Sequence, residues 1–280
     1  MPEGHTLHRL ALDLTDAFAG RRVRVGSPQG RFEESARLLD GQTVVGAEAW
    51  GKQLFVEFPG EQYIHIHLGL IGKLQIIPFD AEPPLPVGQV RLRLIGPDRV
   101  ADLRGATACD LWTQAQRDSC VAKLGPDPLR DDADLERAWL RISRSRTPIG
   151  TLLMDQTVLA GIGNVYRAEV LFRHRIDPMR PGNTLRRGQW QAIWDDLVVL
   201  MKDGVEKNRI DTVRPEHTPE AMGRAPRKDD HGGEVYVYRR AGQPCHVCGT
   251  LVRTTELQQR NLFWCPGCQR RYRPRNHALH

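Results

Sequence analysis

Cys245-His-Val-Cys248 and Cys265-Pro-Gly-Cys268 decide how the C-terminal part of this 280-residue chain folds. Each CxxC pair supplies two thiolates from one tight turn, and two such pairs complete tetrahedral coordination of Zn²⁺. The 16 residues between the pairs have the length of a β-hairpin, whose tip would be held out rigidly. Because all four ligands are sulfur and no position stays open, we expect one structural Zn²⁺ ion.

Two other uses of these cysteines fit the sequence less well. A redox disulfide needs only one CxxC pair, and cytosolic thiols stay reduced. A zinc deaminase shares the Pro244-Cys-x-x-Cys half of the pattern, but the other half, His-x-Glu, occurs nowhere in the chain. Cys109 and Cys120 have no partner at ligand spacing, so we expect them to be packing residues.

The positive charge of the chain is concentrated beside the cysteines. The formal net charge is +6 and the pI is near 9.2. Residues 236–280 contain eight arginines, no lysine and a single acid, Glu256, so this segment carries +7 and the remainder is close to −1. A solvated basic tail would have the same composition. We favour the alternative that the segment contacts nucleic acid.

Composition and the N-terminus predict a soluble protein of the cytoplasm. Hydrophobic residues make up 40% and charged residues 26% of the chain, as in ordinary globular proteins. No run approaches the roughly 18 apolar residues that a membrane span needs, and the polar N-terminus lacks the apolar core of a signal peptide. We therefore expect no secretion and no membrane partner.

The first part of the chain reads as one helix followed by strands. Apolar residues recur there at helical spacing: Leu7, Leu10, Ala11, Leu14 and Phe18. Gly20 ends this helix. Short alternating or β-branched runs at 22–25, 53–58, 63–67, 73–77 and 90–95, separated by Gly and Pro, then indicate an antiparallel sandwich or barrel.

Beyond residue 130 the pattern becomes helical. Leu124-Gly-Pro-Asp-Pro-Leu129 is a stiff connection that marks a boundary, and residues 131–208 read as several helices. Their expected inward residues are Leu135, Trp139, Leu140, Leu152, Leu153, Val158 and Leu159. The polar segment 209–234 is too long for a plain connector, and such loops are usually mobile and functional.

Ala160-Gly-Ile-Gly-Asn164 joins two helical stretches. The glycines permit positive φ and close backbone approach, and Asn164 stands at the expected N-cap of the next helix. A helix start with free N–H groups is a ready phosphate site, although a plain helical connection would look the same.

Pro2 and Glu3 admit two interpretations. Pro suits the first helical turn and an acid there complements the helix dipole. Alternatively, removal of Met1 leaves a secondary amine at Pro2 that can attack a sugar C1′ and form an iminium. An α-amino group with a pKa near 7.7–8.0 is partly neutral at physiological pH, and Glu3 could act as its acid/base partner.

Five segments together resemble the formamidopyrimidine-DNA glycosylase/endonuclease VIII family, from residue 2 to about 272. They are Pro2-Glu-Gly, Trp50-Gly-Lys-Gln-Leu54, His67-Leu-Gly-Leu-Ile-Gly72, Leu153-Met-Asp-Gln156 through Asn164, and Gln259-Arg-Asn-Leu-Phe-Trp-Cys265. The resemblance implies an α+β multidomain fold. Its parts would be an N-terminal helix with an antiparallel β-sandwich, a helix–two-turns–helix domain and a C-terminal zinc-binding β-hairpin with four cysteine ligands.

With this resemblance, the expected division of the chain is complete. It comprises a catalytic β-sandwich domain at 1–115, a linker at 116–130, a helical DNA-binding domain at 131–235 with a lesion-recognition loop at about 209–234, the zinc hairpin at 236–272 and a tail at 273–280.

The resemblance also implies residue roles. Pro2 would be the Schiff-base nucleophile, Glu3 the acid that assists sugar opening and Lys52 the proton donor in β-elimination. Arg260, at the tip of the hairpin, would grip the phosphate beside the lesion and assist δ-elimination. The implied DNA-binding residues are Asn164, Lys123, His67, Arg104 and Leu70, the last as a wedge that fills the gap left by the extruded base.

The chain departs from the family pattern at three places, two of which separate it from oxidised-purine members. Thr6 stands where those members usually have Glu, and Asp102-Leu-Arg-Gly-Ala106 replaces their Arg-Arg-Phe loop. Gly150 stands where many relatives have a lysine that contacts the backbone. The first two changes resemble the endonuclease VIII branch, and Pro-Glu-Gly-His-Thr resembles the second endonuclease VIII paralogue of actinobacteria.

The resulting prediction is a bifunctional DNA glycosylase and abasic-site lyase. It would act by β,δ-elimination on oxidised bases, pyrimidines before purines, as a monomer associated with the nucleoid. Its partner would be damaged DNA, duplex in the first place, with single-stranded or bubble DNA left open. The alternatives are oxidised-purine specificity, a DNA-binding relative without turnover, and a zinc-ribbon protein adaptor.

Overall fold

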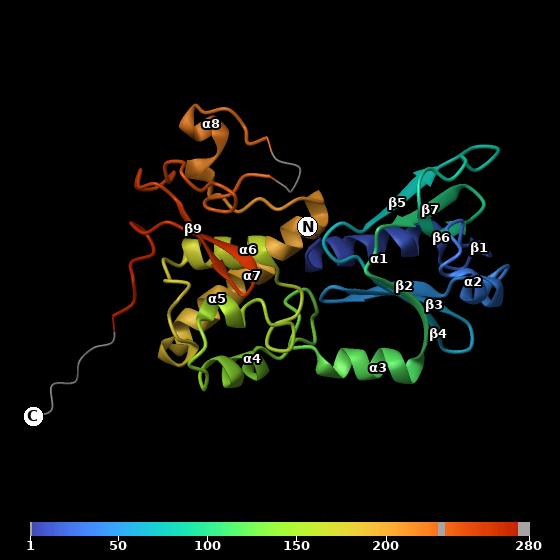
Figure 1. Cartoon of the computed structure of the whole chain (residues 1–280), viewed down its shortest axis with the longest axis horizontal. Helices are drawn as coiled ribbons and strands as arrows, with labels where there is room; N and C mark the ends of the chain where they lie inside the picture. The colour runs from blue at the N-terminus through green and yellow to red at the C-terminus, as the bar shows by residue number, and fades with distance from the viewer. Residues whose placement is uncertain (1, 229–232, 274–280) are drawn as a thin grey trace, which may run out of the picture. The chain divides into compact units, whose positions relative to one another are not determined.

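The computed structural model describes residues 2–228 and 233–273, so the expected removal of Met1 and most of the predicted tail at 273–280 lie outside it. The chain divides into two compact units, Met1–Leu124 (unit 1) and Gly125–His280 (unit 2). Figure 1 labels their helices and strands. Within the described residues, no helix combines the length and the apolar character that crossing a membrane requires.

Unit 1 is a β-sandwich with a helix inside it, which confirms the expected N-terminal architecture. Helix α1 lies between two four-stranded antiparallel sheets, ordered β1-β6-β7-β5 and β2-β3-β4-β8 (Figure 1). Leu7, Leu14 and Phe18 on α1 are almost fully buried in the core between the sheets. The elements are α1 (Gly4–Phe18), β1 (Arg24–Gly26), α2 (Glu33–Leu39), β2 (Gly46–Trp50), β3 (Gln53–Phe58), β4 (Gln62–His67), β5 (Lys73–Pro78), β6 (Val90–Ile95), β7 (Arg99–Arg104), β8 (Ala108–Thr113) and α3 (Gln114–Lys123).

Period-two alternation in β3 and β4 sends apolar side chains to the core and a second set to the other face. Leu54 and Ile66 are paired in register and belong to the core. On the other face His65 stacks on Trp112, with ring centroids 3.7 Å apart, and its Nε2 lies 2.8 Å from Oε1 of Gln53. This face is therefore also ordered by side-chain packing.

The segment expected to be a linker, 116–130, begins as a helix. Residues 116–123 belong to α3, which continues directly from β8 and lies in unit 1. Thr113 and Gln116 form a capping box that starts this helix, and no Gly or Pro interrupts it before Leu124. The extended connection is therefore shorter than expected and begins only at Leu124.

Unit 2 is built around helix α6 (Asn164–Arg173), which is buried along nearly its whole length, from Asn164 to Phe172. The expected helices over 131–208 are present, although Leu140 is exposed because Ala138 and Ile142 face the core instead. The other elements are α4 (Leu135–Ile142), α5 (Ile149–Leu152), η1 (Gly182–Thr184), α7 (Arg187–Lys207), η2 (Pro215–His217), α8 (Pro219–Met222), β9 (Arg253–Leu257) and β10 (Arg260–Trp264).

Glu169 on α6 ties three parts of unit 2 together. Its side chain is fully buried, and Oε1 accepts hydrogen bonds from the amides of Val237 and Tyr238, both at 2.8 Å. Oε2 accepts from the amide of Tyr236 at 2.7 Å and from the hydroxyl of Thr212 at 2.6 Å. One carboxylate thus anchors the start of the zinc segment and the base of the 209–234 loop.

The 209–234 loop has structure of its own in its described part. It contains η2 and α8, and its two ends pair where the amide of Thr212 donates to the carbonyl oxygen of Glu234 at 2.8 Å. Glu234 also forms an ion pair with Arg224 at 2.6 Å. Residues 229–232 of this segment lie outside the described residues.

Candidate active site and metal centre

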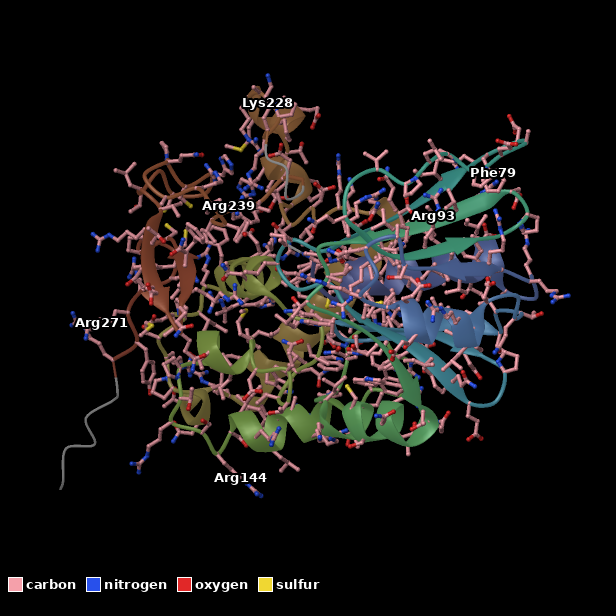
Figure 2. All side chains as sticks on the ribbon, turned by 45° about the vertical axis from the view of Figure 1, so that its right-hand side comes forward. Phe79, Arg93, Arg144, Lys228, Arg239 and Arg271 are labelled. Carbon is pink, nitrogen blue, oxygen red and sulfur yellow. The ribbon has the colours of Figure 1, made fainter. Side chains whose placement is uncertain are left out.

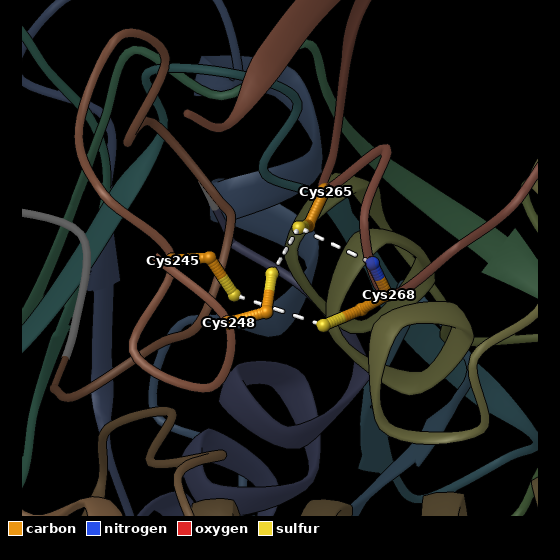
Figure 3. A group of neighbouring side chains, drawn as sticks. All are labelled: Cys245, Cys248, Cys265 and Cys268. Carbon is orange, nitrogen blue, oxygen red and sulfur yellow. Dashed lines mark hydrogen bonds between the residues drawn. The ribbon is translucent and has the colours of Figure 1, made fainter. Parts of the chain in front are cut away.

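The four cysteines expected to bind zinc converge in unit 2. Their Sγ atoms all lie within 4.8 Å of one another, with Cys248 and Cys265 at 3.4 Å and Cys245 and Cys268 at 3.9 Å (Figure 3). Tetrahedral zinc with Zn–S bonds of about 2.3 Å requires sulfurs about 3.8 Å apart. The donor set therefore fits one structural zinc ion, and coordination by four cysteines leaves no ligand position for catalysis.

The cysteines sit in tight turns whose amides point at sulfur. The amide of Val247 donates to Sγ of Cys245 at 3.4 Å, and that of Cys268 to Sγ of Cys265 at 3.5 Å. Gln269, which no sequence pattern singled out, is buried and accepts from the amide of Cys265 at 3.0 Å. Its Nε2 donates to the carbonyl oxygen of Ile176 at 2.9 Å, so the metal centre is attached to the core of unit 2.

The other two cysteines differ from each other. Cys109 is buried in the core between the sheets of unit 1, and burial raises the pKa of its thiol to about 12. It is a packing residue, as expected. Cys120 is half-buried on α3, a helix without fully buried residues, so it packs only at the edge of unit 1.

Pro2 precedes the first helix instead of starting it. Helix α1 begins at Gly4, and Glu3 is its N-cap in extended conformation, with its carbonyl oxygen accepting from the amide of Thr6 at 2.9 Å. The Glu3 side chain is fully buried, whereas Pro2 is only half-buried. The interpretation of Pro2 as a first-turn residue therefore loses its support, and an acid lies beside it away from bulk water.

His5 is a further titratable group at this end of the chain. Burial, together with the positive charge of the N-terminal amine and of His8, lowers the pKa of His5 to about 4. The imidazole is thus neutral at pH 7. The sequence signal for it was only its position two residues after Glu3.

Lys52 occupies the two-residue turn between β2 and β3. Trp50 and Gln53 pair across the turn, and Gly51 has φ +57°, the value that glycine takes at the first central position of a type II′ turn. The ring of His67, at the end of β4, donates from Nδ1 to the carbonyl oxygen of Lys52 at 3.0 Å. The fold therefore brings Lys52 and His67 together. Nε2 of His67 lies on the side of the ring away from this hydrogen bond.

Leu70 lies in a tightly wound turn between β4 and β5. It is 50% exposed and the adjacent Ile71 is 83% exposed, an unusual pair of apolar side chains at the surface. A side chain at Gly72 would come within 2.8 Å of Cα of Leu68, and one at Gly69, where φ is +68°, would clash with Thr107. Glycine thus permits a turn that presents two apolar side chains to solvent.

Arg104 is held by its own unit. Its Nε donates to the carbonyl oxygen of Val87 at 2.7 Å and its guanidinium pairs with the buried Asp102 at 2.9 Å. Arg93, labelled in Figure 2, lies 3.7 Å from the same carboxylate. Much of the hydrogen-bonding capacity of Arg104 is therefore used within the protein. Lys123, by contrast, is exposed at the last position of α3.

Asn164 is not the N-cap that the sequence predicted. Gly163 is the N-cap of α6, and Asn164 is the first helical residue. Its side chain turns to the zinc hairpin instead: Nδ2 donates to the carbonyl oxygen of Asn261 at 2.8 Å, and Oδ1 accepts from Arg167. The small polar side chain thus joins α6 to β10.

Arg260 stands at the end of the zinc hairpin, where the resemblance placed it. Leu257 and Arg260 pair across the turn formed by Gln258 and Gln259, whose φ values are +51° and +57°. Two positive φ values identify a type I′ turn. Arg239 and Arg271, labelled in Figure 2, belong to the same basic segment.

The predicted site residues fall into two groups, one in each unit. Unit 1 contains Pro2, Glu3, Lys52, His67, Leu70, Arg104 and Lys123, and unit 2 contains Asn164, Arg260 and the four cysteines. Within unit 1, Pro2 and Glu3 are neighbours in the chain, and Lys52 and His67 are joined by a hydrogen bond. Within unit 2, Asn164 bonds the residue after Arg260, and the four cysteines lie close to one another.

Three family models match the sequence. Residues 1–109 match the formamidopyrimidine-DNA glycosylase N-terminal domain, and residues 124–214 match the formamidopyrimidine-DNA glycosylase H2TH domain. Residues 242–271 match the zinc finger found in FPG and IleRS. Together these matches cover both units and include the four cysteines.

Whole proteins and solved structures give the same result. A Mycobacterium tuberculosis (strain ATCC 25618 / H37Rv) protein named Endonuclease 8 1 is 52% identical, over 96% of this chain and 100% of that protein. Probable endonuclease 8 2 of Streptomyces coelicolor is 34% identical, over 98% and 96%. The Lactococcus lactis Fpg complex with an abasic site containing DNA shares the fold, with a TM-score of 0.77 at 23% identity over 96% and 100%. The chain therefore belongs to the formamidopyrimidine-DNA glycosylase/endonuclease VIII family.

Proposed function

We propose that this protein is a bifunctional DNA glycosylase and abasic-site lyase whose nucleophile is the amine of Pro2. The observation that carries the proposal is that Pro2 precedes α1 and is followed in the chain by Glu3, whose side chain is fully buried. Because the nucleophile and the acid/base group belong to adjacent residues, no packing of distant segments is needed to bring them together. Membership of the family supplies the reaction class.

The proposed chemistry consists of base release, iminium formation, two eliminations and hydrolysis. The neutral nitrogen of Pro2, freed by removal of Met1, attacks C1′ while the glycosidic C–N bond breaks and the departing base takes a proton. Glu3 transfers the proton that opens the sugar ring, which yields an iminium between Pro2 and C1′. Loss of a C2′ proton then expels the 3′ phosphate, and loss of a C4′ proton expels the 5′ phosphate, before water hydrolyses the iminium and releases the sugar fragment from Pro2.

Lys52 and Arg260 would assist the eliminations. Lys52 is positioned by the turn that His67 braces, and would donate a proton and contact phosphate. Arg260 at the hairpin end would hold the phosphate beside the lesion and stabilise its departure. Zinc supplies no step, because its four sulfur ligands serve to fold the hairpin.

The remaining contacts would hold damaged DNA. We assign Asn164, Lys123, His67 and Arg104 to the DNA backbone, with Asn164 and Arg104 the weakest because their side chains already bond Asn261 and Asp102. Leu70 would enter the space of the extruded base, an insertion for which its half-exposed side chain and glycine-rich turn are suited. The +7 charge of residues 236–280 favours a polyanion over a protein partner.

We propose oxidised pyrimidines as the preferred substrates, in duplex DNA, with the protein acting as a cytoplasmic, nucleoid-associated monomer. Support comes from Thr6 and the 102–106 segment, and from higher identity to a protein named Endonuclease 8 1 than to those named formamidopyrimidine-DNA glycosylase. Single-turnover rates on oxidised-pyrimidine and oxidised-purine oligonucleotides, each in duplex, bubble and single-stranded form, test this. Faster purine release would replace the proposal by its alternative.

Borohydride trapping tests the mechanism. The wild type should form a covalent adduct with an abasic duplex, and peptide mapping by mass spectrometry should locate it on Pro2. Glu3→Gln should lose base release, whereas Glu34→Gln, at an exposed position of α2, should behave as wild type. Absence of an adduct despite DNA binding would leave a DNA-binding relative without turnover. Weak, salt-insensitive DNA binding would instead support the adaptor.

A further inference from the structure

Arg167 is an arginine in an unusual place. It lies on α6, one turn after Asn164, and is 1% exposed, among the largest fully buried side chains of the described protein. Burying a guanidinium costs several kcal/mol unless its N–H groups find acceptors. Where its donors go therefore shows what the residue does.

The donors of Arg167 reach two other elements of unit 2. Nη1 donates to the carbonyl oxygen of Gly150 on α5 at 3.3 Å, and Nη2 donates to Oδ1 of Asn164. Nη2 also lies 3.3 Å from the carbonyl oxygen of Asn261, the atom that accepts from Nδ2 of Asn164 at 2.8 Å. Arg167 thus orients the Asn164 amide, and both donate to one carbonyl of β10.

That carbonyl is one residue from Arg260. The hairpin beyond it is lightly supported, since β9 is exposed from Arg253 to Glu256 and the turn has two non-glycine residues at positive φ. Non-glycine residues at positive φ cost stability, so contacts elsewhere in the hairpin must hold this turn. The bonds to the Asn261 carbonyl therefore restrict the position of the Arg260 backbone, which is only one residue away.

We propose that Arg167 is a positioning residue for Arg260: it holds the zinc hairpin against α6 so that the guanidinium of Arg260 meets the phosphate beside the lesion. The inference rests on the role proposed above for Arg260. A planar fork that spans three acceptors is required, and lysine, with the same charge, cannot reproduce it. Shape, and not charge alone, should thus matter at this position.

A double-mutant cycle on the full-length, zinc-loaded protein tests the inference. The measurement is the single-turnover rate of strand cleavage at a preformed abasic site, with zinc content and circular dichroism checked for each variant. We expect Arg167→Lys and Arg260→Gln each to slow cleavage about 10- to 100-fold. The double variant should be no slower than Arg260→Gln within about 2-fold, because Arg167 acts through Arg260.

Arg240→Lys is the matched control. Arg240 is also buried in unit 2, at 5% exposure, and donates to the carbonyl oxygens of Tyr236 and Pro244, away from the hairpin end. Whatever fold-reduction in cleavage rate Arg240→Lys causes, it should multiply with the fold-reduction caused by Arg260→Gln in the double variant. If Arg167 had a merely structural role, the fold-reductions in cleavage rate caused by Arg167→Lys and Arg260→Gln would multiply in the same way.

Several results would overturn the inference. Multiplying effects of Arg167→Lys and Arg260→Gln would do so while leaving the role of Arg260 intact, and full activity of Arg260→Gln would remove both. If Arg167→Lys and Arg167→Gln both lose zinc or fold, NMR of the wild type decides. The guanidinium signals of Arg167 should shift when abasic duplex binds and those of Arg240 should not; unchanged Arg167 signals would contradict the inference.

Discussion

Replacing Glu169 by glutamine perturbs the carboxylate that gathers four donors in the middle of unit 2. The amide group must point its NH₂ at two of those donors. Facing the amides of Val237 and Tyr238, it would oppose two N–H groups that cannot turn away. Facing Tyr236 and Thr212, it opposes one N–H and a hydroxyl that can rotate to accept, so this orientation should be preferred.

The size of the effect follows from this geometry. The amide of Tyr236 is left buried without an acceptor, at a cost of about 1–3 kcal/mol, and the other bonds weaken from charged to neutral by about 1 kcal/mol each. Cheaper burial of a neutral side chain offsets part of this loss. We expect unit 2 to lose about 3–5 kcal/mol of unfolding free energy, or roughly 10 °C in Tm for a unit of this size.

Differential scanning calorimetry of the zinc-loaded protein measures this change, with Glu220→Gln as the control. Glu220 lies exposed on α8 in the same unit, so its substitution changes the net charge equally without touching a buried bond. Zinc retention after brief chelator exposure should also fall in Glu169→Gln, since residues 236–238 lead into the cysteines. Melting of Glu169→Gln within about 2 °C of the control would refute the reasoning.

Three further predictions concern packing, pH and the metal. Gly125→Ala should destabilise unit 2 by about 2–4 kcal/mol in urea unfolding, because a Cβ there would press on the backbone of Val158 and come within 2.6 Å of the Leu159 nitrogen. Gly188→Ala on α7, where nothing lies within 4 Å, should be neutral or stabilising by up to about 1 kcal/mol. Burial, and secondarily His67, lowers the pKa of His65 to about 4, so the unfolded chain takes up this proton first as pH falls. His65 should therefore lower the free energy of unfolding of unit 1 by about 1.4 kcal/mol per pH unit as pH falls from 6.5 to 4, and His5 should add a second share of that size, so His65→Gln should remove about half of the slope that the two histidines cause. Removal of zinc by a chelator should abolish protection of the β9–β10 amides in hydrogen exchange and weaken DNA binding; an unchanged hairpin would contradict a structural role for the metal.

Local pattern and spacing predicted most of the architecture. The helix at the N-terminus, the strands and the four-cysteine centre rest on periodicity and on ligand spacing, which act over a few residues and need no partner elsewhere in the chain. The linker was expected to be longer than it is, because the capping box of Thr113 and Gln116 starts a helix inside it. The two residues of this capping box stand three positions apart in the sequence, so the start of the helix was visible there.

The contacts of four residues could not be predicted in this way. Asn164 looked like an N-cap because such residues usually bond their own helix, whereas its amide bonds a hairpin nearly a hundred residues later. Arg167 and Glu169 interrupt an otherwise apolar buried helix, which marks them as paired but does not say with what. Arg104 is a candidate DNA contact by residue type, but the sequence does not show that its guanidinium is paired with Asp102.

The amino-acid sequence by itself determined the family, the zinc ligands and the identity of Pro2, Glu3, Lys52 and Arg260 as the candidate site, because these depend on residue type and spacing along the chain. Only the tertiary structure decided that Pro2 precedes its helix, that His67 braces Lys52 and that Arg167 and Asn164 hold the hairpin beside Arg260. The reason is physical: a hydrogen bond between distant segments depends on where packing brings them, and no local preference of either segment encodes that distance.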